Sequence, residues 1–272
     1  MATSEALHDR FGRNVVFAIT VSGPEGTAGA IAQAVEAVGA RIGDMNTVGI
    51  QDEHVVRELV VFAADDAQMD GVRQGLAALD GVEVAETRDV AMDSHLGGAC
   101  EMRGRCSIES NTDLRIVYTP GVARVCKAIQ KDPALARTHT NLANKVAIAT
   151  NGTAILGLGD IGPVAGLPVM EGKAAIFWEF AGISAEPVLV DTHDPDEFIG
   201  VMEKLACGFG AIQIEDVKAP ECFPITRELD RRLDIPVLHD DQHGTATVVL
   251  AGLYSALKKT GRTLGDLRCA IS

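Results

Sequence analysis

The sequence lacks the features that mark several classes of protein. None of its six cysteines forms a Cys-x-x-Cys pair or another spacing typical of zinc sites. The first ten residues carry charge and contain no apolar core, unlike a signal peptide. No apolar run approaches the roughly 20 residues that span a bilayer. We therefore expect a cytoplasmic protein with reduced thiols and no membrane partner.

Positive charge is also scarce. The chain has 24 lysines and arginines against 38 acidic residues, a net charge of −14, which argues against nucleic acid as a partner. A small acidic substrate is still compatible with this balance, because a bound cation inverts the local field. The length of 272 residues, with 47% apolar and 23% charged residues, is typical of a soluble globular protein with room for two domains.

The first ninety or so residues predict a small α+β domain. Apolar residues alternate over 15–21 as in a half-buried strand, and a helical spacing follows over 31–38. Two further strands, a second helix and a last strand are expected at 41–50, 55–62, 72–79 and 82–84. The resulting β-α-β-β-α-β order is the ferredoxin-like arrangement.

This order, together with the Gly-Pro-Glu-Gly turn at 23–26, resembles an ACT regulatory domain over roughly residues 12–92. We therefore assign residues 1–93 to an ACT-like regulatory domain. The resemblance implies that the helix opening at Gly23–Thr27 offers free N–H groups to the carboxylate of a small-molecule effector. The alternative is an ordinary tight turn in a domain that only mediates dimerisation.

From residue 114 onward, strand-like and helix-like segments alternate. Helices are expected over residues 122–129, 198–205 and 245–259. A strand is expected over 146–150, and further strands or buried segments over 174–180, 187–190, 211–214 and 236–238. Such alternation predicts an α/β domain with a mainly parallel sheet.

Two pairs of carboxylates each follow one of these apolar runs. Glu215 and Asp216 follow the run at 211–214, and Asp240 and Asp241 follow the next run along the chain. Adjacent parallel strands deliver their C-terminal ends to one crevice, where α/β proteins bind ligands. Four carboxylates there would repel one another unless a hard divalent cation such as Mg²⁺ or Mn²⁺ were bound. The alternative is that some of these acids are helix N-caps or solvated loop ends.

Residues 157–162, Gly-Leu-Gly-Asp-Ile-Gly, match the dinucleotide fingerprint G-x-G-x-x-G literally, and Glu179 lies about twenty residues further on. That fingerprint also needs a helix that opens at the glycines. Pro163, Gly166 and Pro168 make a continuous helix there improbable. We therefore expect a tight loop that holds the next segment in the site, and we assign no nicotinamide-binding residue.

Two further side chains have suggestive chemistry. Lys173 is an isolated cation between apolar stretches, and partial burial near a metal would lower its pKa so that it can act as a base. The alternative is a solvated surface lysine. Tyr118, one of two tyrosines, precedes a Pro-Gly turn and a helix start, where its phenol either donates a proton or only packs.

Five segments, in their order and spacing, resemble the malic enzyme family in its small bacterial form. The most specific strings are Tyr-Thr-Pro-Gly-Val-Ala, Glu-Asp-Val-Lys-Ala-Pro-Glu-Cys-Phe and His-Asp-Asp-Gln-His-Gly-Thr-Ala. The segments lie at 118–123, 157–162, 168–173, 214–224 and 235–246. The resemblance covers roughly residues 94–272 and implies a malic enzyme N-terminal domain, which binds substrate and metal.

The resemblance also implies a role for each matched residue and a reaction. The implied roles are ligands of Mg²⁺ or Mn²⁺ for Glu215, Asp216 and Asp241, general base for Lys173, its carboxylate partner for Asp240, and general acid for Tyr118. The implied reaction is oxidative decarboxylation of malate, through oxaloacetate, to pyruvate and CO₂ with NAD or NADP. A homodimer is the implied assembly.

The sequence ends with residues 267–272, an apolar run like the first strand of a further domain. In the family, the nicotinamide site follows at this point. We therefore expect a fragment without its cofactor domain, which need not transfer hydride on its own. Two alternatives are a non-catalytic, metal-dependent module that binds organic acids or an effector, and a residual oxaloacetate decarboxylase that needs no nicotinamide.

Overall fold

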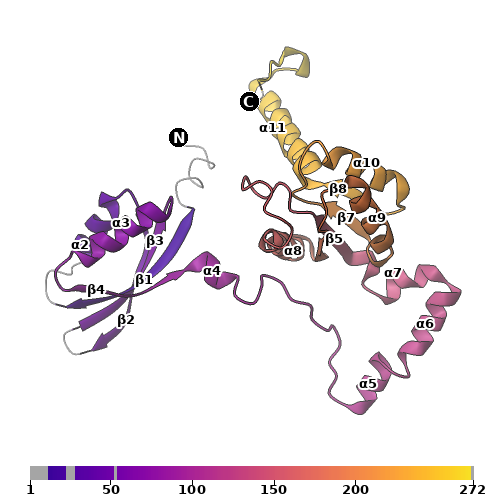
Figure 1. The fold of residues 1–272 in the computed structure, drawn as a ribbon, viewed down its shortest axis with the longest axis horizontal. Helices are drawn as coiled ribbons and strands as arrows, with labels where there is room; N and C mark the ends of the chain where they lie inside the picture. The colour runs from indigo at the N-terminus through magenta and orange to yellow at the C-terminus, as the bar shows by residue number, and fades with distance from the viewer. Residues whose placement is uncertain (1–11, 23–27, 52–53, 271–272) are drawn as a thin grey trace. The chain divides into compact units, whose positions relative to one another are not determined.

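The computed structural model describes residues 12–22, 28–51 and 54–270 (Figure 1). The chain divides into two compact units, Met1–Gly97 and Gly98–Ser272, each with its own hydrophobic core. The division falls after Gly97, whereas the sequence placed the boundary at residue 93. The loop Gly23–Thr27, expected to take an effector, lies outside the described residues.

The first unit is an antiparallel sheet with helices packed against it. Its elements are β1 (Arg13–Ser22), α2 (Ala28–Ala37), β2 (Arg41–Gln51), β3 (His54–Ala63), α3 (Asp66–Ala77), β4 (Val82–Asp89) and the short α4 (Val90–Ser94). The strands lie in the order β2-β3-β1-β4, and each neighbouring pair is antiparallel. The β-α-β-β-α-β order expected from the sequence is therefore confirmed.

Alternation along β1 explains why this sheet has one buried face. Val15, Phe17, Ile19 and Val21 are buried, whereas the residues between them are partly exposed. Side chains of a strand point alternately to its two faces, so these four cover one face. Apolar residues of β3 and of both long helices complete this core: Ile31, Val35, Leu59, Val61, Met69, Val72 and Leu76.

The second unit begins with short helices and continues as a parallel α/β domain. The helices are α5 (Asn111–Val117), α6 (Val122–Lys131) and α7 (Ala136–His139). The α/β part contains β5 (Lys145–Thr150), α8 (Leu167–Ala181), β6 (Ser184–Leu189), α9 (Pro195–Leu205), β7 (Ala211–Ile214), α10 (Cys222–Arg232), β8 (Val237–His239) and α11 (Thr245–Thr260). The strand order is β6-β5-β7-β8 with every pair parallel, which confirms the expected sheet type.

β5 is buried on both faces, as a central parallel strand requires. Ala147 and Ala149 pack with residues of α9 and α10, whereas Ile148 packs with Met170 and Ala174 of α8. Successive residues of a strand face opposite sides, so α8 covers one face of the sheet and α9 and α10 cover the other. This arrangement leaves the C-terminal ends of β7 and β8 side by side at one edge.

The structure corrects the expectation for residues 174–180. They form the second half of α8 rather than a strand or a buried segment. Ile176, Trp178 and Phe180 are 51, 63 and 83% exposed, so apolar side chains occur around much of this helix and hide its period. Pro168 lies in the first turn of α8, where a proline does not interrupt a helix.

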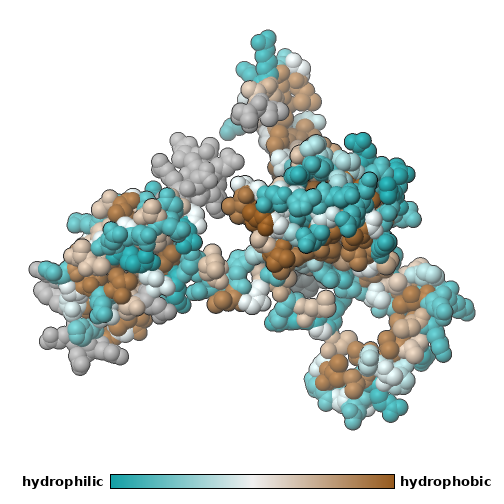
Figure 2. All heavy atoms as spheres, viewed as in Figure 1, coloured by the Kyte–Doolittle hydropathy of each residue, from teal (hydrophilic) through white to brown (hydrophobic). Residues whose placement is uncertain are grey.

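The described chain ends in α11 and irregular backbone. Residues 267–270 form no strand, contrary to the expectation for this run. Val248, Val249 and Leu250 on α11 are 67, 56 and 47% exposed, and apolar surface along this helix is visible in Figure 2. Within the described residues, every helix is too short or too polar to cross a lipid bilayer.

Candidate metal centre

Glu215 and Asp216 directly follow β7 at the C-terminal edge of the parallel sheet. The Glu215 amide donates a hydrogen bond to the Ala149 carbonyl at 2.9 Å, which ties the pair to the central strand β5. Both acids are buried, with 5% exposure each. Asp216 has a φ of +51°, in the left-handed region that is strained for most side chains. Backbone strain at a buried acid is a feature that occurs often at functional sites.

Asp240 and Asp241 come from the turn after β8. Residues Asp240–Gly244 form one π-type turn, η4, that leads into α11. Gly244 leaves room for the Asp240 carboxylate, because a Cβ at that position would lie 2.4 Å from Asp240 Oδ1. Asp240 is partly buried and Asp241 is exposed. Single π turns occur frequently at functional sites, where they redirect side chains.

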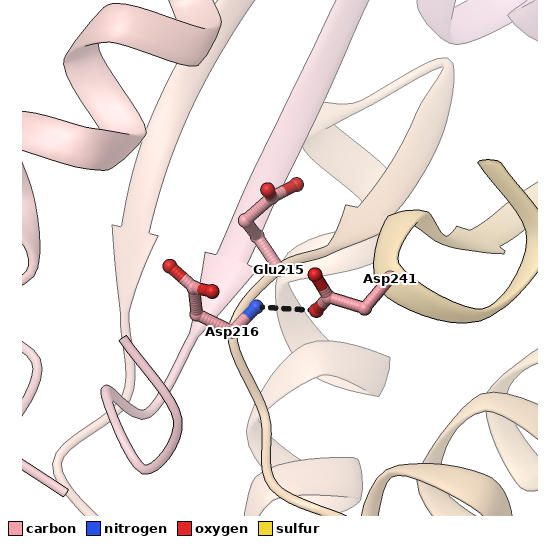
Figure 3. Close-up of side chains that lie close together, drawn as sticks. All are labelled: Glu215, Asp216 and Asp241. Atoms are coloured by element: carbon pink, nitrogen blue, oxygen red, sulfur yellow. Dashed lines mark hydrogen bonds between the residues drawn. The ribbon is translucent and has the colours of Figure 1, made fainter. Parts of the chain in front are cut away.

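The two strand ends bring three carboxylates together, as Figure 3 shows. Ligand oxygens of Glu215, Asp216 and Asp241 all lie within 4.8 Å of one another. The Asp216 amide also donates to Asp241 Oδ2 at 3.1 Å, so the two acid pairs are linked directly. The acids are thus not separate helix caps or separate loop ends but one cluster.

Lys173 joins this cluster from α8. Its Nζ donates to Asp240 Oδ2 at 2.9 Å and lies 3.1 Å from Glu215 Oε1. The lysine side chain is 24% exposed, so its charge is partly removed from water. Lys173 therefore bridges the two strand ends, and it is not a solvated surface lysine.

Burial and the neighbouring carboxylates raise the pKa values of Glu215 and Asp216. Burial raises the pKa of Glu215 to about 7, against the opposing charge of Lys173. Burial, and then the charge of Asp241, raise the pKa of Asp216. Burial by itself lowers the pKa of Lys173, but the hydrogen bond to Asp240 and the charge of Glu215 raise it above its usual value. The carboxylates thus hold the proton on Nζ, and the lower pKa expected beside a bound metal stays a prediction.

The cluster fits a hard divalent cation. Carboxylate oxygens are the ligands that Mg²⁺ and Mn²⁺ prefer. Asp216 Oδ2 is buried and has no hydrogen-bond partner in the described part of the chain. The acids at the two strand ends also outnumber the single lysine that contacts them, and a bound cation would offset this negative charge. The unmet acceptor and the excess of negative charge are both compatible with a cation between the strand ends.

The glycine-rich loop at 157–162 supports Asp216. The Leu156 backbone, which leads into the loop, hydrogen-bonds the Asp216 carboxylate. The loop closes on Gly152, because the Gly162 amide donates to the Gly152 carbonyl at 3.1 Å. A Cβ on Gly152 would lie 2.2 Å from the Gly162 backbone, so only glycine allows this approach.

The same loop does not have the geometry of a dinucleotide site. Residues 163–166 separate Gly162 from Leu167, where α8 begins. The glycines therefore do not open a helix, and the free N–H groups that would hold a pyrophosphate are not placed at them. The literal match to the fingerprint is misleading for this reason.

Sequence reasoning missed two buried polar residues. Gln213, within β7, is 4% exposed and donates to Glu215 Oε2. His239, the last residue of β8, is 2% exposed and places Nε2 3.8 Å from Asp241 Oδ2. Burial lowers the pKa of His239, against the opposing charge of Asp241. Both residues could have been noticed in the sequence, because each is a polar residue within or next to an apolar run that leads to an acid pair.

Tyr118 is not brought to this cluster. It ends α5 and is 66% exposed, and its amide donates to the Leu114 carbonyl at 2.9 Å. Among the contacts between described residues, none joins Tyr118 to the clustered acids or to Lys173. The role of general acid therefore stays a prediction.

Comparison with known proteins gives this site a family context. Residues 101–195 match the family described as malic enzyme, N-terminal domain. The NAD-dependent malic enzyme of Geobacillus stearothermophilus is 45% identical over 242 residues, which are 89% of this chain and 51% of the relative. The NADP-dependent malic enzyme of Haemophilus influenzae is 44% identical over 190 residues, 69% of this chain and 25% of the relative. The chain thus spans about half the length of the first relative, and the match to it extends beyond the second unit into the first.

Solved malic enzyme structures share the fold of much of the chain. The Pyrococcus horikoshii enzyme superimposes with a TM-score of 0.61 at 48% identity and covers 62% of this chain and 39% of that one. The NAD-dependent enzyme of Thermotoga maritima gives a TM-score of 0.60 at 42% identity and covers 62% of this chain and 48% of that one. The relatives therefore include both NAD- and NADP-dependent malic enzymes.

Proposed function

We propose that the chain is the metal- and substrate-binding part of a malic enzyme, an oxidoreductase that converts malate to pyruvate and CO₂. One observation carries the proposal: Glu215, Asp216 and Asp241 converge at the strand ends, and Lys173 contacts the same cluster. The names of the relatives suggest the reaction, and the geometry supports a set of residues that can perform it.

The proposed Mg²⁺ or Mn²⁺ ligands are Glu215, Asp216 and Asp241. When bound, such an ion would polarise the substrate oxygens as a Lewis acid, and its charge would favour the neutral form of Lys173. Hydrogen bonds within the chain hold two of these ligands. The Asp216 amide fixes Asp241, and the Gln213 amide group fixes Glu215.

Lys173 is the proposed acceptor of the proton on the C2 hydroxyl of malate. In its neutral form, Nζ offers a lone pair at the edge of the acid cluster. Asp240 Oδ2, 2.9 Å from Nζ, is the next acceptor for that proton. Its side chain is 35% exposed, so the Lys173–Asp240 pair connects the site with solvent.

Tyr118 is the proposed donor of the proton that C3 takes up after CO₂ leaves. This role rests on the matched string around Tyr118 and requires the exposed phenol to reach the acid cluster. Positioned acids of this kind contribute about 10²–10⁴-fold to a rate.

The oxidant and the assembly are proposed from the relatives. Their names specify NAD or NADP, so we propose that a nicotinamide takes the hydride from malate. Malate, oxaloacetate and pyruvate are then the small-molecule partners, a homodimer is the proposed assembly, and the cytoplasm is the proposed location. No described residue is assigned to the nicotinamide.

An effector function is proposed for the first unit. Its strand order supports an ACT-like domain, and a hollow on this unit is lined by Ser22, His54 and Gly81. A small carboxylic or amino acid that binds there would raise the melting temperature of this unit alone. Such acids can be screened by differential scanning calorimetry. If none of them changes the melting temperature of the first unit, an effector function is contradicted.

The test of the proposed reaction joins this chain to the C-terminal half of the Geobacillus stearothermophilus relative. We expect malate-dependent NADH formation in the presence of Mn²⁺. Lys173→Met should lower it by about 10²–10⁴-fold, whereas Lys204→Met, on the exposed face of α9, should leave it unchanged. Equal rates of NADH formation in the two variants would contradict the proposed role of Lys173. A folded, Mn²⁺-binding fusion that does not oxidise malate would contradict the proposed function.

A further inference from the structure

His239 is a buried histidine whose ring orientation is fixed by the backbone. It ends β8 and is 2% exposed. Its Nδ1 accepts a hydrogen bond from the Gln242 amide at 3.2 Å. A ring nitrogen that accepts a hydrogen bond carries no proton, so the neutral ring has its proton on Nε2.

The Nε2–H group has no normal hydrogen bond. Nε2 is buried and lacks a hydrogen-bond partner within the described residues. It lies 3.8 Å from Asp241 Oδ2, slightly beyond hydrogen-bond length. A buried donor without an acceptor is unfavourable, so a small movement that brings this carboxylate oxygen to Nε2 is favoured.

Asp241 uses the same oxygen for its other protein contact. Oδ2 accepts from the Asp216 amide at 3.1 Å, so two donors of the protein face Oδ2. Among the described hydrogen bonds, none goes to Oδ1. A carboxylate that is held through one oxygen presents the other in a defined direction, as supporting hydrogen bonds do at many metal sites.

We propose that His239 is a positioning residue of the cation site, in which Nε2–H holds Asp241 Oδ2 and thereby directs Oδ1 at the ion. This inference rests on the proposed function, because it takes Asp241 as a ligand. The backbone of Val217 is a competing hydrogen-bond partner of the ring. A histidine that served only that backbone would stabilise the fold without any effect on metal affinity, so the two roles can be separated.

Two substitutions distinguish the ring nitrogens. His239→Asn places an amide oxygen near the position of Nδ1 and removes the Nε2 donor, whereas His239→Gln carries a donor to the position of Nε2. We expect the asparagine variant to bind Mn²⁺ about 10–100-fold more weakly than the unchanged chain by calorimetry. The glutamine variant should bind Mn²⁺ almost as tightly as the unchanged chain. Without metal, we expect both variants to have melting temperatures lower than that of the unchanged chain by a similar amount.

Two results would overturn the positioning role. One is an unchanged Mn²⁺ affinity of His239→Asn, and the other is an equal loss in both variants. An unchanged chain that does not bind Mn²⁺ would instead contradict the proposed function itself. Histidine nitrogen NMR gives a readout apart from affinity: we expect the Nε2–H tautomer, with a resonance that shifts when Mg²⁺ is added. The Nδ1–H tautomer would contradict the inference.

Discussion

Two residues at the acid cluster have strained backbone conformations. Asp216 has a φ of +51° and Leu156 a φ of +44°, and the Leu156 backbone hydrogen-bonds the Asp216 carboxylate. Conformations of this kind cost about 1–3 kcal/mol each. Both residues lie where the carboxylates converge, so the strain coincides with the proposed ligands. This coincidence favours a binding role for Asp216 over a purely structural one.

Gly244→Ala tests whether the turn after β8 must stay closed. The new Cβ would lie 2.4 Å from Asp240 Oδ1, so the carboxylate or the turn must move. We expect a loss of about 1–3 kcal/mol in the free energy of unfolding, measured with urea, and weaker Mn²⁺ binding.

Gly252→Ala is the matched control for that change. Gly252 lies on α11, and a Cβ there meets no atom within 4 Å. Alanine is favoured over glycine inside a helix by up to about 1 kcal/mol, so this variant should be neutral or more stable. Equal destabilisation by the two substitutions would contradict the account of Gly244.

The sequence allowed the acids to be predicted but not all their supports. The ends of two neighbouring parallel strands suffice to predict that the two acid pairs converge. The choice of Asp241 over Asp240 as a ligand came from the family resemblance. The contact of Lys173 with Glu215 could not be predicted from the residues alone, because it depends on how α8 packs against the sheet. The support from Gln213 was also missed, since a polar residue inside a short strand gives no sign of its partner.

At the scale of elements, the spacing of apolar residues predicted most strands and helices. It failed for α8. β1 alternates cleanly because one of its faces is buried. α8 has apolar residues on exposed as well as buried positions, so no single helical face is visible in its sequence. Its proline at the first turn reads as a helix breaker unless the start of the helix is already known.

Asp65→Ala tests the start of α3 in the first unit. The Asp65 side chain accepts a hydrogen bond from the Gln68 amide at 2.8 Å as the N-cap of this helix. We expect the change to lower the unfolding free energy of this unit by about 1 kcal/mol. Asp70→Ala, which removes an exposed ion pair with Arg73, should change it by less than about 0.5 kcal/mol. A larger effect at Asp70, followed by urea unfolding, would contradict the capping role.

At the scale of the whole molecule, two separate cores predict two separate unfolding transitions. Leu59 in the first core and Leu229 in the second are both fully buried. Truncation of a buried leucine to alanine costs about 2–5 kcal/mol. In differential scanning calorimetry, Leu59→Ala should lower the melting temperature of one transition and Leu229→Ala that of the other. One transition that shifts equally in both variants would show that the units unfold together.

The central claim is that a divalent cation binds at Glu215, Asp216 and Asp241, and calorimetry of Mn²⁺ binding tests it most directly. We expect the chain to bind one Mn²⁺ ion at this cluster and Asp241→Asn to lose that binding. Asp230→Asn, on the exposed face of α10, should bind Mn²⁺ like the unchanged chain. Equal binding by Asp241→Asn, or no binding by the unchanged chain, would contradict the claim.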